Sequence, residues 1–128
     1  MEYSFNVIEF PQFLHVKAFG RNDAQTIQRC LKDIHDVCVS RNASAVLVEE
    51  NFIGPSLDIA EIFGQVIKGS QNVGPIRCIA YVDVNPEHDF ARMRFAETVA
   101  LNRGVNIRVF QTVPEAEQWL VDVLRIQK

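Results

Sequence analysis

Polar side chains that could do chemistry gather after two apolar segments in the middle of the sequence. They are carboxylates, amides, a hydroxyl and one histidine: Glu49, Glu50, Asn51, Ser56 and Asp58 after the first segment, and Asp83, Asn85, Glu87, His88 and Asp89 after the second. Carboxylates near a histidine can bind a metal ion or relay protons. The alternative, which we favour, is that most of these residues cap helices or place negative charge in a first helical turn.

The elements that position these residues begin with a predicted hairpin. Residues 5–10 and 13–19 are short, aromatic and β-branched stretches separated by Pro11, a pattern typical of two antiparallel strands. In the second stretch His15 and Lys17 share a face that we expect to be at least partly in contact with water. A helix follows, because apolar residues recur at steps of three and four from 27 to 38, after a cap at Asn22 or Asp23.

Three further strand and helix pairs complete the predicted fold. Apolar runs predict strands at 45–48, 76–82 and 106–110. Helices are expected at 56–68, from Asn85 to Gly104, and after Thr112, where a Thr-x-x-Glu capping box begins. Consecutive βα units require parallel strands with right-handed crossovers. The prediction is therefore one α/β domain over residues 1–128, with a mixed five-stranded sheet covered by four helices in the order ββαβαβαβα. Open sheets of this kind place their sites at the carboxyl ends of the strands.

Composition and charge argue against several classes of protein. The 13 basic and 16 acidic residues leave a net charge of −3, which gives no attraction to nucleic acids. No apolar run approaches the roughly 18–20 residues of a membrane span, and the first residues lack the basic segment of a secretion signal. Cys30, Cys38 and Cys78 lie in apolar patterns without metal-site spacing, which indicates reduced core thiols in a cytoplasmic protein.

Sequence motifs of the common α/β enzymes are absent. There is no glycine-rich dinucleotide or phosphate loop, no C-x-x-C and no G-x-S-x-G. A response-regulator receiver would need an aspartate after the third strand and a lysine after the last, where this chain has Glu49-Glu50 and Gln111-Thr112. We therefore predict a protein that is not an enzyme, with no catalytic residue, no cofactor and no metal.

Three stretches of the sequence carry a resemblance to a known family. They are the opening hairpin, the passage VLVEENFIGPSLDIAEIF at 46–63 and the ending FAETVALNRGVNIRVFQTVPEAEQWL at 95–120. Over nearly its whole length the chain resembles a STAS-type domain, the fold of bacterial anti-sigma-factor antagonists. It is most similar to the small stand-alone SpoIIAA-like proteins, also described as STAS/SEC14-like. The resemblance implies a regulatory module that binds a protein partner.

The resemblance also directs attention to Ser56. In the antagonists, a partner kinase phosphorylates a serine at the start of the second helix, and by position only Ser56 corresponds. Phosphate is well placed at the positive end of a helix. The antagonists have an aspartate, two serines and a glycine in this loop, whereas this chain has Gly54-Pro55-Ser56-Leu57. The alternative, which we favour, is that Ser56 only caps the helix, a contribution of about 1 kcal/mol.

Two hypotheses for function remain open. In the first, a protein partner docks on the loop after the third strand and on the second helix, and the candidate surface is Asn51, Phe52, Ile53, Ser56 and Asp58. Large apolar residues in an exposed loop are costly unless something covers them. The alternative is that Phe52 and Ile53 fold beneath the loop as part of the core.

In the second hypothesis the domain binds a small apolar ligand or lipid, as the SEC14-like relatives imply. The candidate cleft lies between the second and third helices and is lined by Phe52, Ile53, Phe63, Phe90, Met93 and Phe95. Ordinary core packing explains the same residues. A cavity of a few hundred Å³ would favour the ligand hypothesis over the partner hypothesis. A homodimer is also compatible with the sequence, because the strand predicted at 5–10 would be an exposed edge.

Overall fold

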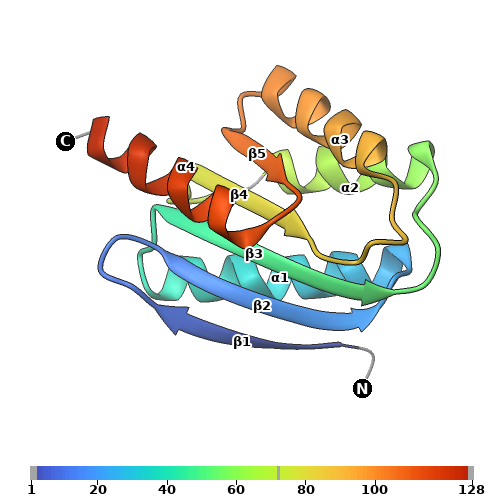
Figure 1. Cartoon of the computed structure of the whole chain (residues 1–128), viewed down its shortest axis with the longest axis horizontal. Helices are drawn as coiled ribbons and strands as arrows, with labels where there is room; N and C mark the ends of the chain where they lie inside the picture. The colour runs from blue at the N-terminus through green and yellow to red at the C-terminus, as the bar shows by residue number, and fades with distance from the viewer. Residues whose placement is uncertain (1–2, 72, 127–128) are drawn as a thin grey trace.

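The computed structural model describes residues 3–71 and 73–126, and it confirms the predicted order ββαβαβαβα. The elements are β1 (Tyr3–Glu9), β2 (Leu14–Arg21), α1 (Ala24–Ser40), β3 (Ala45–Ile53), α2 (Ile59–Ser70), β4 (Cys78–Asp83), α3 (Phe90–Asn102), β5 (Ile107–Phe110) and α4 (Val113–Ile126) (Figure 1). Within the described residues, no helix is long and apolar enough to cross a membrane.

The five strands form one mixed sheet in which neighbours in space are also neighbours in sequence, β1-β2-β3-β4-β5. The β1–β2 pair is antiparallel, and every later pair is parallel. The register places Glu50, near the end of β3, beside Asp83 at the end of β4. The chain reversals after these two strands therefore lie next to each other, as the sequence predicts.

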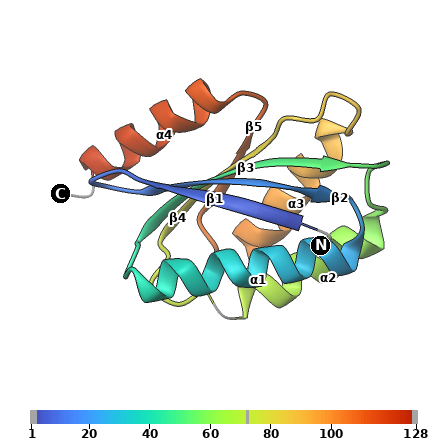
Figure 2. The same cartoon turned by 90° about the horizontal axis from the view of Figure 1, so that it is seen from below.

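Three helices cover one face of the sheet and the fourth covers the other (Figure 2). Right-handed crossovers between strands added in one direction place α1, α2 and α3 on the same face. The core on that face joins α1 to β2 and β3 through residues such as Val16, Val48 and Cys30. On the opposite face, Leu120 of α4 packs with Leu47 and neighbouring residues of β3 and β4.

Strand β3 is longer than the prediction, which ended it at Val48. It continues to Ile53 because β2 pairs with it as far as Arg21. Side chains alternate across this extension, so that Glu50 and Phe52 are buried on the face covered by α1 while Glu49 and Asn51 point to the other face. An apolar run could not reveal this part of the strand.

The expectation that His15 contacts water is wrong. Only 6% of His15 is exposed, and its Nε2 lies 2.9 Å from Oε1 of Glu49 on the neighbouring strand β3. A polar partner across the sheet allows the imidazole to be buried on this face. Lys17, two residues later on the same face of β2, is exposed as predicted.

Two of the predicted helix starts are also wrong. The second helix begins at Ile59 with Asp58 as its N-cap, so Ser56 does not cap it. The third begins at Phe90 with Asp89 as its N-cap, four residues after the Asn85 cap that the Asn-Pro-Glu pattern predicted. The cap of the first helix is confirmed, because Asp23 accepts a hydrogen bond from the Thr26 backbone N–H at 2.9 Å.

Candidate functional site

A buried ion pair lies where β4 ends. His88 Nδ1 is 2.6 Å from Asp83 Oδ2, and His88 Nε2 is 2.7 Å from the carbonyl oxygen of Gly54. Both of these neighbours are acceptors, and the ring can donate to both at once only in its protonated form, so the two contacts favour the imidazolium; Asn85 Nδ2 also lies 3.4 Å from Nε2. Burial acts to lower the pKa of His88, but the hydrogen bonds to Asp83 and Gly54 outweigh it and raise that pKa above its ordinary value.

Hydrogen bonds tie the loop before α3 to the loop before α2. Asn85 Nδ2 donates to the carbonyl of Phe52 at 2.8 Å, and the backbone N–H of Asp89 donates to Ser56 Oγ at 3.0 Å. Gly54 adopts a φ of +131°, a conformation that glycine tolerates without strain, and its carbonyl accepts from His88. These hydrogen bonds join the end of β3 and the two loops at the carboxyl edge of the sheet.

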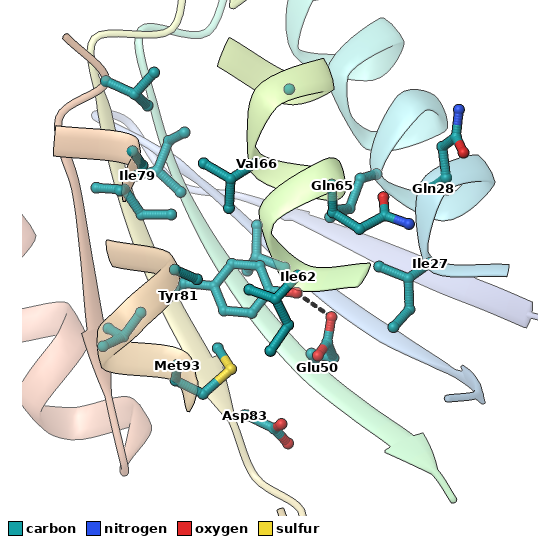
Figure 3. Close-up of a pocket in the computed structure, with 18 of the residues that line it drawn as sticks. Ile27, Gln28, Glu50, Ile62, Gln65, Val66, Ile79, Tyr81, Asp83 and Met93 are labelled. Atoms are coloured by element: carbon teal, nitrogen blue, oxygen red, sulfur yellow. Dashed lines mark hydrogen bonds between the residues drawn. The ribbon is translucent and has the colours of Figure 1, made fainter. Parts of the chain in front are cut away.

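Glu50 is a buried acid beside this ion pair. Only 4% of the residue is exposed, and Oε2 accepts a hydrogen bond from the Tyr81 hydroxyl (Figure 3). Burial raises the pKa of Glu50 to about 7, and the charge of Asp83 adds to the increase while the Tyr81 hydrogen bond and His88 oppose it. Burial together with the adjacent Glu50 raises the pKa of Tyr81, so its hydroxyl remains a donor at neutral pH.

A cavity of about 470 Å³ lies between the sheet and the three helices α1, α2 and α3. Its walls are mostly apolar, and Figure 3 shows Glu50 and Asp83 close together beside apolar residues of the helices and strands. Among the apolar side chains are Ile27, Leu31, Val48, Ile62, Val66, Ile79 and Met93. The volume falls in the range of small-molecule sites.

Helix α2 covers this cavity without burying a single residue completely. Polar contacts hold it to its neighbours: Gln65 Nε2 donates to the carbonyl of Ala24 at 2.6 Å, and Lys68 Nζ donates to Gln28 Oε1 at 3.2 Å, both on the side of α1. On the side of α3, Arg103 Nε donates to Ser70 Oγ at 2.9 Å. These contacts join α2 to the two neighbouring helices, and the helix does not pack directly onto the sheet.

The structure separates the residues of the predicted partner surface. Phe52 is fully buried in the core beneath α1, so its expected place on an exposed surface is wrong. Ile53 is 54% exposed because the alternation of β3 turns it to the other face. Asn51 is half-buried, and Asp58 accepts from the Glu61 backbone N–H at 2.8 Å within a capping box. Ser56 lies in the loop and accepts from Asp89, as described above.

The predicted ligand cleft is wrong in position, although a cavity exists nearby. Of its six residues only Met93 lines the cavity. Phe63 is 48% exposed on the outer side of α2, and the half-buried Phe90 and Phe95 are not among the lining residues. The aromatic content of the two helices suggested a cleft between them, whereas the cavity lies beneath α2, against the sheet.

Sequence reasoning noted Glu50 as one of several acids but did not single it out, and it missed Tyr81 altogether. A signal was present in the alternation Val46, Val48, Glu50, Phe52, where one acid occupies an inward position among apolar residues. The metal interpretation of the acidic cluster finds no support, because no three His, Cys, Asp or Glu side chains within 3–71 and 73–126 are grouped as metal ligands.

Comparison with known proteins gives a match in structure and none in sequence. No family model and no curated protein matches the chain. The crystal structure of an anti-sigma factor antagonist from Mycobacterium paratuberculosis is similar with a TM-score of 0.60, over 92% of this chain and 93% of that one, at 12% sequence identity. This confirms the resemblance inferred from the sequence at the level of the fold: the chain has the architecture of an anti-sigma factor antagonist.

Proposed function

We propose that this chain is a non-enzymatic regulatory module of STAS type that binds a partner protein through the outer side of α2 and the loop before it. The fold shared with an anti-sigma factor antagonist supports a role of this kind. The observation that carries the proposal is the exposure of two large apolar residues of α2: Ile59 is 47% exposed and Phe63 48%. Ile59 and Phe63 are one turn apart on one helix face, and we call these two residues the α2 surface.

A charge placed on the α2 surface tests this proposal. Phe63→Asp leaves the core intact, so the variant should unfold at the same temperature as wild type while losing its partner. Leu101→Asp is the matched control, because Leu101 is 50% exposed on α3, outside the α2 surface. Tagged proteins recovered from cells should differ in one captured species, retained by wild type and Leu101→Asp and lost by Phe63→Asp. Identical capture by all three proteins would refute the assignment of the surface.

A second candidate function is the binding of a small apolar ligand. The cavity beneath α2 favours it, because its volume of about 470 Å³ lies within the range of small-molecule binding sites. Native mass spectrometry of protein taken directly from cells is the test. We expect the native protein to carry the additional mass of a bound ligand, and the denatured protein to lack it. The same spectrum reports a phosphate on Ser56 and the mass of a homodimer, both of which stay predictions.

A further inference from the structure

Glu50 lines the cavity, and only one of its two carboxylate oxygens has a hydrogen-bond donor. Oε2 accepts from the Tyr81 hydroxyl, and within the described part of the chain no donor is paired with Oε1. The residue is 4% exposed and borders the cavity. A carboxylate oxygen that faces a cavity and has no donor from the protein can accept a hydrogen bond from a ligand there, and such a bond to a charged group is among the stronger ones.

The charges around Glu50 indicate the sign of the head group. Asp83 already has its own cation, because His88 Nδ1 donates to it at 2.6 Å. Arg92 is directed elsewhere: it donates to the carbonyl of Leu57 and its Nε lies 3.9 Å from Asp89 Oδ2. Glu50 is thus an acid beside a matched pair, with no cation of its own among the described residues. An ammonium group would supply both the missing donor and the missing charge, whereas an anionic head would meet two carboxylates.

The rest of the cavity sets the chemistry of the remainder of the ligand. Val48, Ile62, Val66 and Met93 present hydrocarbon and thioether surface to it, and the sheet side is equally apolar at Ile79. Each methylene group that leaves water for such a wall favours binding. The ligand therefore needs an apolar body attached to the donor-bearing end.

We propose that the cavity beneath α2 binds an amphiphilic amine, whose ammonium group donates to Oε1 of Glu50 while its hydrocarbon part lies among the apolar side chains of α2, α3 and the sheet. This inference rests on the second candidate function, the binding of a small apolar ligand. It adds the class of ligand and the residue that recognises it.

Three probes with the same chain and different head groups test the proposal: n-octylamine, n-octanol and octanoate, titrated calorimetrically into the full chain at pH 8. Octylamine should bind at least tenfold more tightly than octanol, and octanoate most weakly. Glu50→Gln should remove the preference for the amine and leave the affinity for octanol within about threefold. Glu49→Gln is the matched control, since Glu49 is the adjacent acid on the opposite face of β3, bonded to His15, and should bind all three probes as wild type does.

The possible outcomes separate the two levels of the inference. Equal binding of the three probes, or a preference for octanoate, would overturn recognition by Glu50 and leave ligand binding standing. No binding of any probe would overturn both the amine proposal and the ligand function. If Glu50→Gln does not fold, a pH series on wild type replaces it: octylamine affinity should fall several-fold from pH 8 to pH 5.5 as Glu50 is protonated. The groups facing Glu50 are Tyr81, Asp83, His88 and Cys30, and the first and last stay protonated throughout because their pKa values are raised.

Discussion

His88 Nδ1 lies 2.6 Å from Asp83 Oδ2, with 5% of the histidine side chain and 7% of the aspartate side chain exposed. The second ring nitrogen of His88 donates to the carbonyl of Gly54, which belongs to the loop after β3. The imidazole of His88 thus connects the end of β4 to the loop that leads into α2. The pair therefore holds the end of β4 and the loop before α2 together beside the candidate site.

Removing this imidazole should destabilise the fold strongly. His88→Ala leaves the Asp83 carboxylate buried without its cation, and breaking such a pair typically costs about 3–5 kcal/mol. Urea unfolding of the variant measures the loss. Glu87→Ala, an exposed neighbour in the same loop, should stay within about 0.5 kcal/mol of wild type. Equal stability of the two variants would mean that the ion pair contributes little.

Glu50 should make the protein less stable as the pH rises. Its pKa in the folded protein is about 7 against an ordinary value of 4.5, so its favourable contribution is complete below pH 4.5 and is lost as the pH rises through 7. His88, whose pKa is also raised, adds a loss in the same direction above pH 6.5. Glu50→Gln removes the first effect and should be up to about 3 kcal/mol more stable than wild type at pH 8, at roughly 1.4 kcal/mol for each pKa unit.

The difference between wild type and Glu50→Gln should shrink toward zero at pH 4, where the wild-type carboxyl is neutral as well. Thermal or urea unfolding from pH 4 to pH 8 gives the comparison, with Glu49→Gln as the variant that should show no such gain. A wild-type protein that is more stable than Glu50→Gln at pH 8 would contradict the burial of a costly carboxylate.

The cap of α2 is Asp58, so the two residues near its start should behave differently when replaced by alanine. Asp58→Ala removes the acceptor for the Glu61 backbone N–H and should cost about 1 kcal/mol. Ser56→Ala removes the acceptor for the Asp89 backbone N–H instead. Amide hydrogen exchange distinguishes them: Glu61 should exchange faster in the first variant and Asp89 in the second. Faster exchange of Glu61 in Ser56→Ala would restore the original capping hypothesis.

Phe52 and Ile53 are adjacent in sequence and should differ sharply in their effect on stability. Phe52 is fully buried, and Phe52→Ala should cost about 3–5 kcal/mol through lost contacts and the space left behind. Ile53→Ala, at a position 54% exposed, should change the free energy of unfolding by less than about 1 kcal/mol. Chemical denaturation measures both, and similar costs would place both residues in the core.

The cysteines should be unreactive until the protein unfolds. Burial raises the pKa of Cys30 to about 12, with Glu50 and Asp33 adding to the increase, and burial raises the pKa of Cys38 to about 11. Thiolate is the reactive form, so a thiol reagent at pH 8 should label these residues at the rate of unfolding. Rapid labelling of the native protein would contradict the burial.

Local patterns in the sequence were sufficient for the order of elements and the direction of the strands. The helical spacing from Ile27 to Cys38 and the apolar run from Ala45 to Val48 are both confirmed. The starts of the helices were harder to predict from the sequence. Ser56 and Asn85 have side chains that can cap a helix, but in the structure they bond to a neighbouring chain segment instead. Those contacts join residues 33 positions apart, and no local pattern encodes them.

The cavity was less predictable still. Its walls come from α1, α2, α3 and the sheet, and its existence depends on how far α2 stands from the strands. Apolar residues at Ile62 and Val66 predict a buried helix face equally well whether that face touches the sheet or a space above it. Glu50, an acid at an inward position of a strand, was the sequence signal that pointed to these walls.

Because α2 is held by contacts to its neighbouring helices and not by the sheet, both its inner and its outer side are available for contacts. Its inner residues, Ile62 and Val66, border the cavity, and its outer residues, Ile59 and Phe63, are exposed to solvent. Under the two functions proposed above, a ligand beneath α2 and a protein partner on its outer side would contact the same helix. Any effect of one on the affinity of the other would then be reciprocal and equal in size.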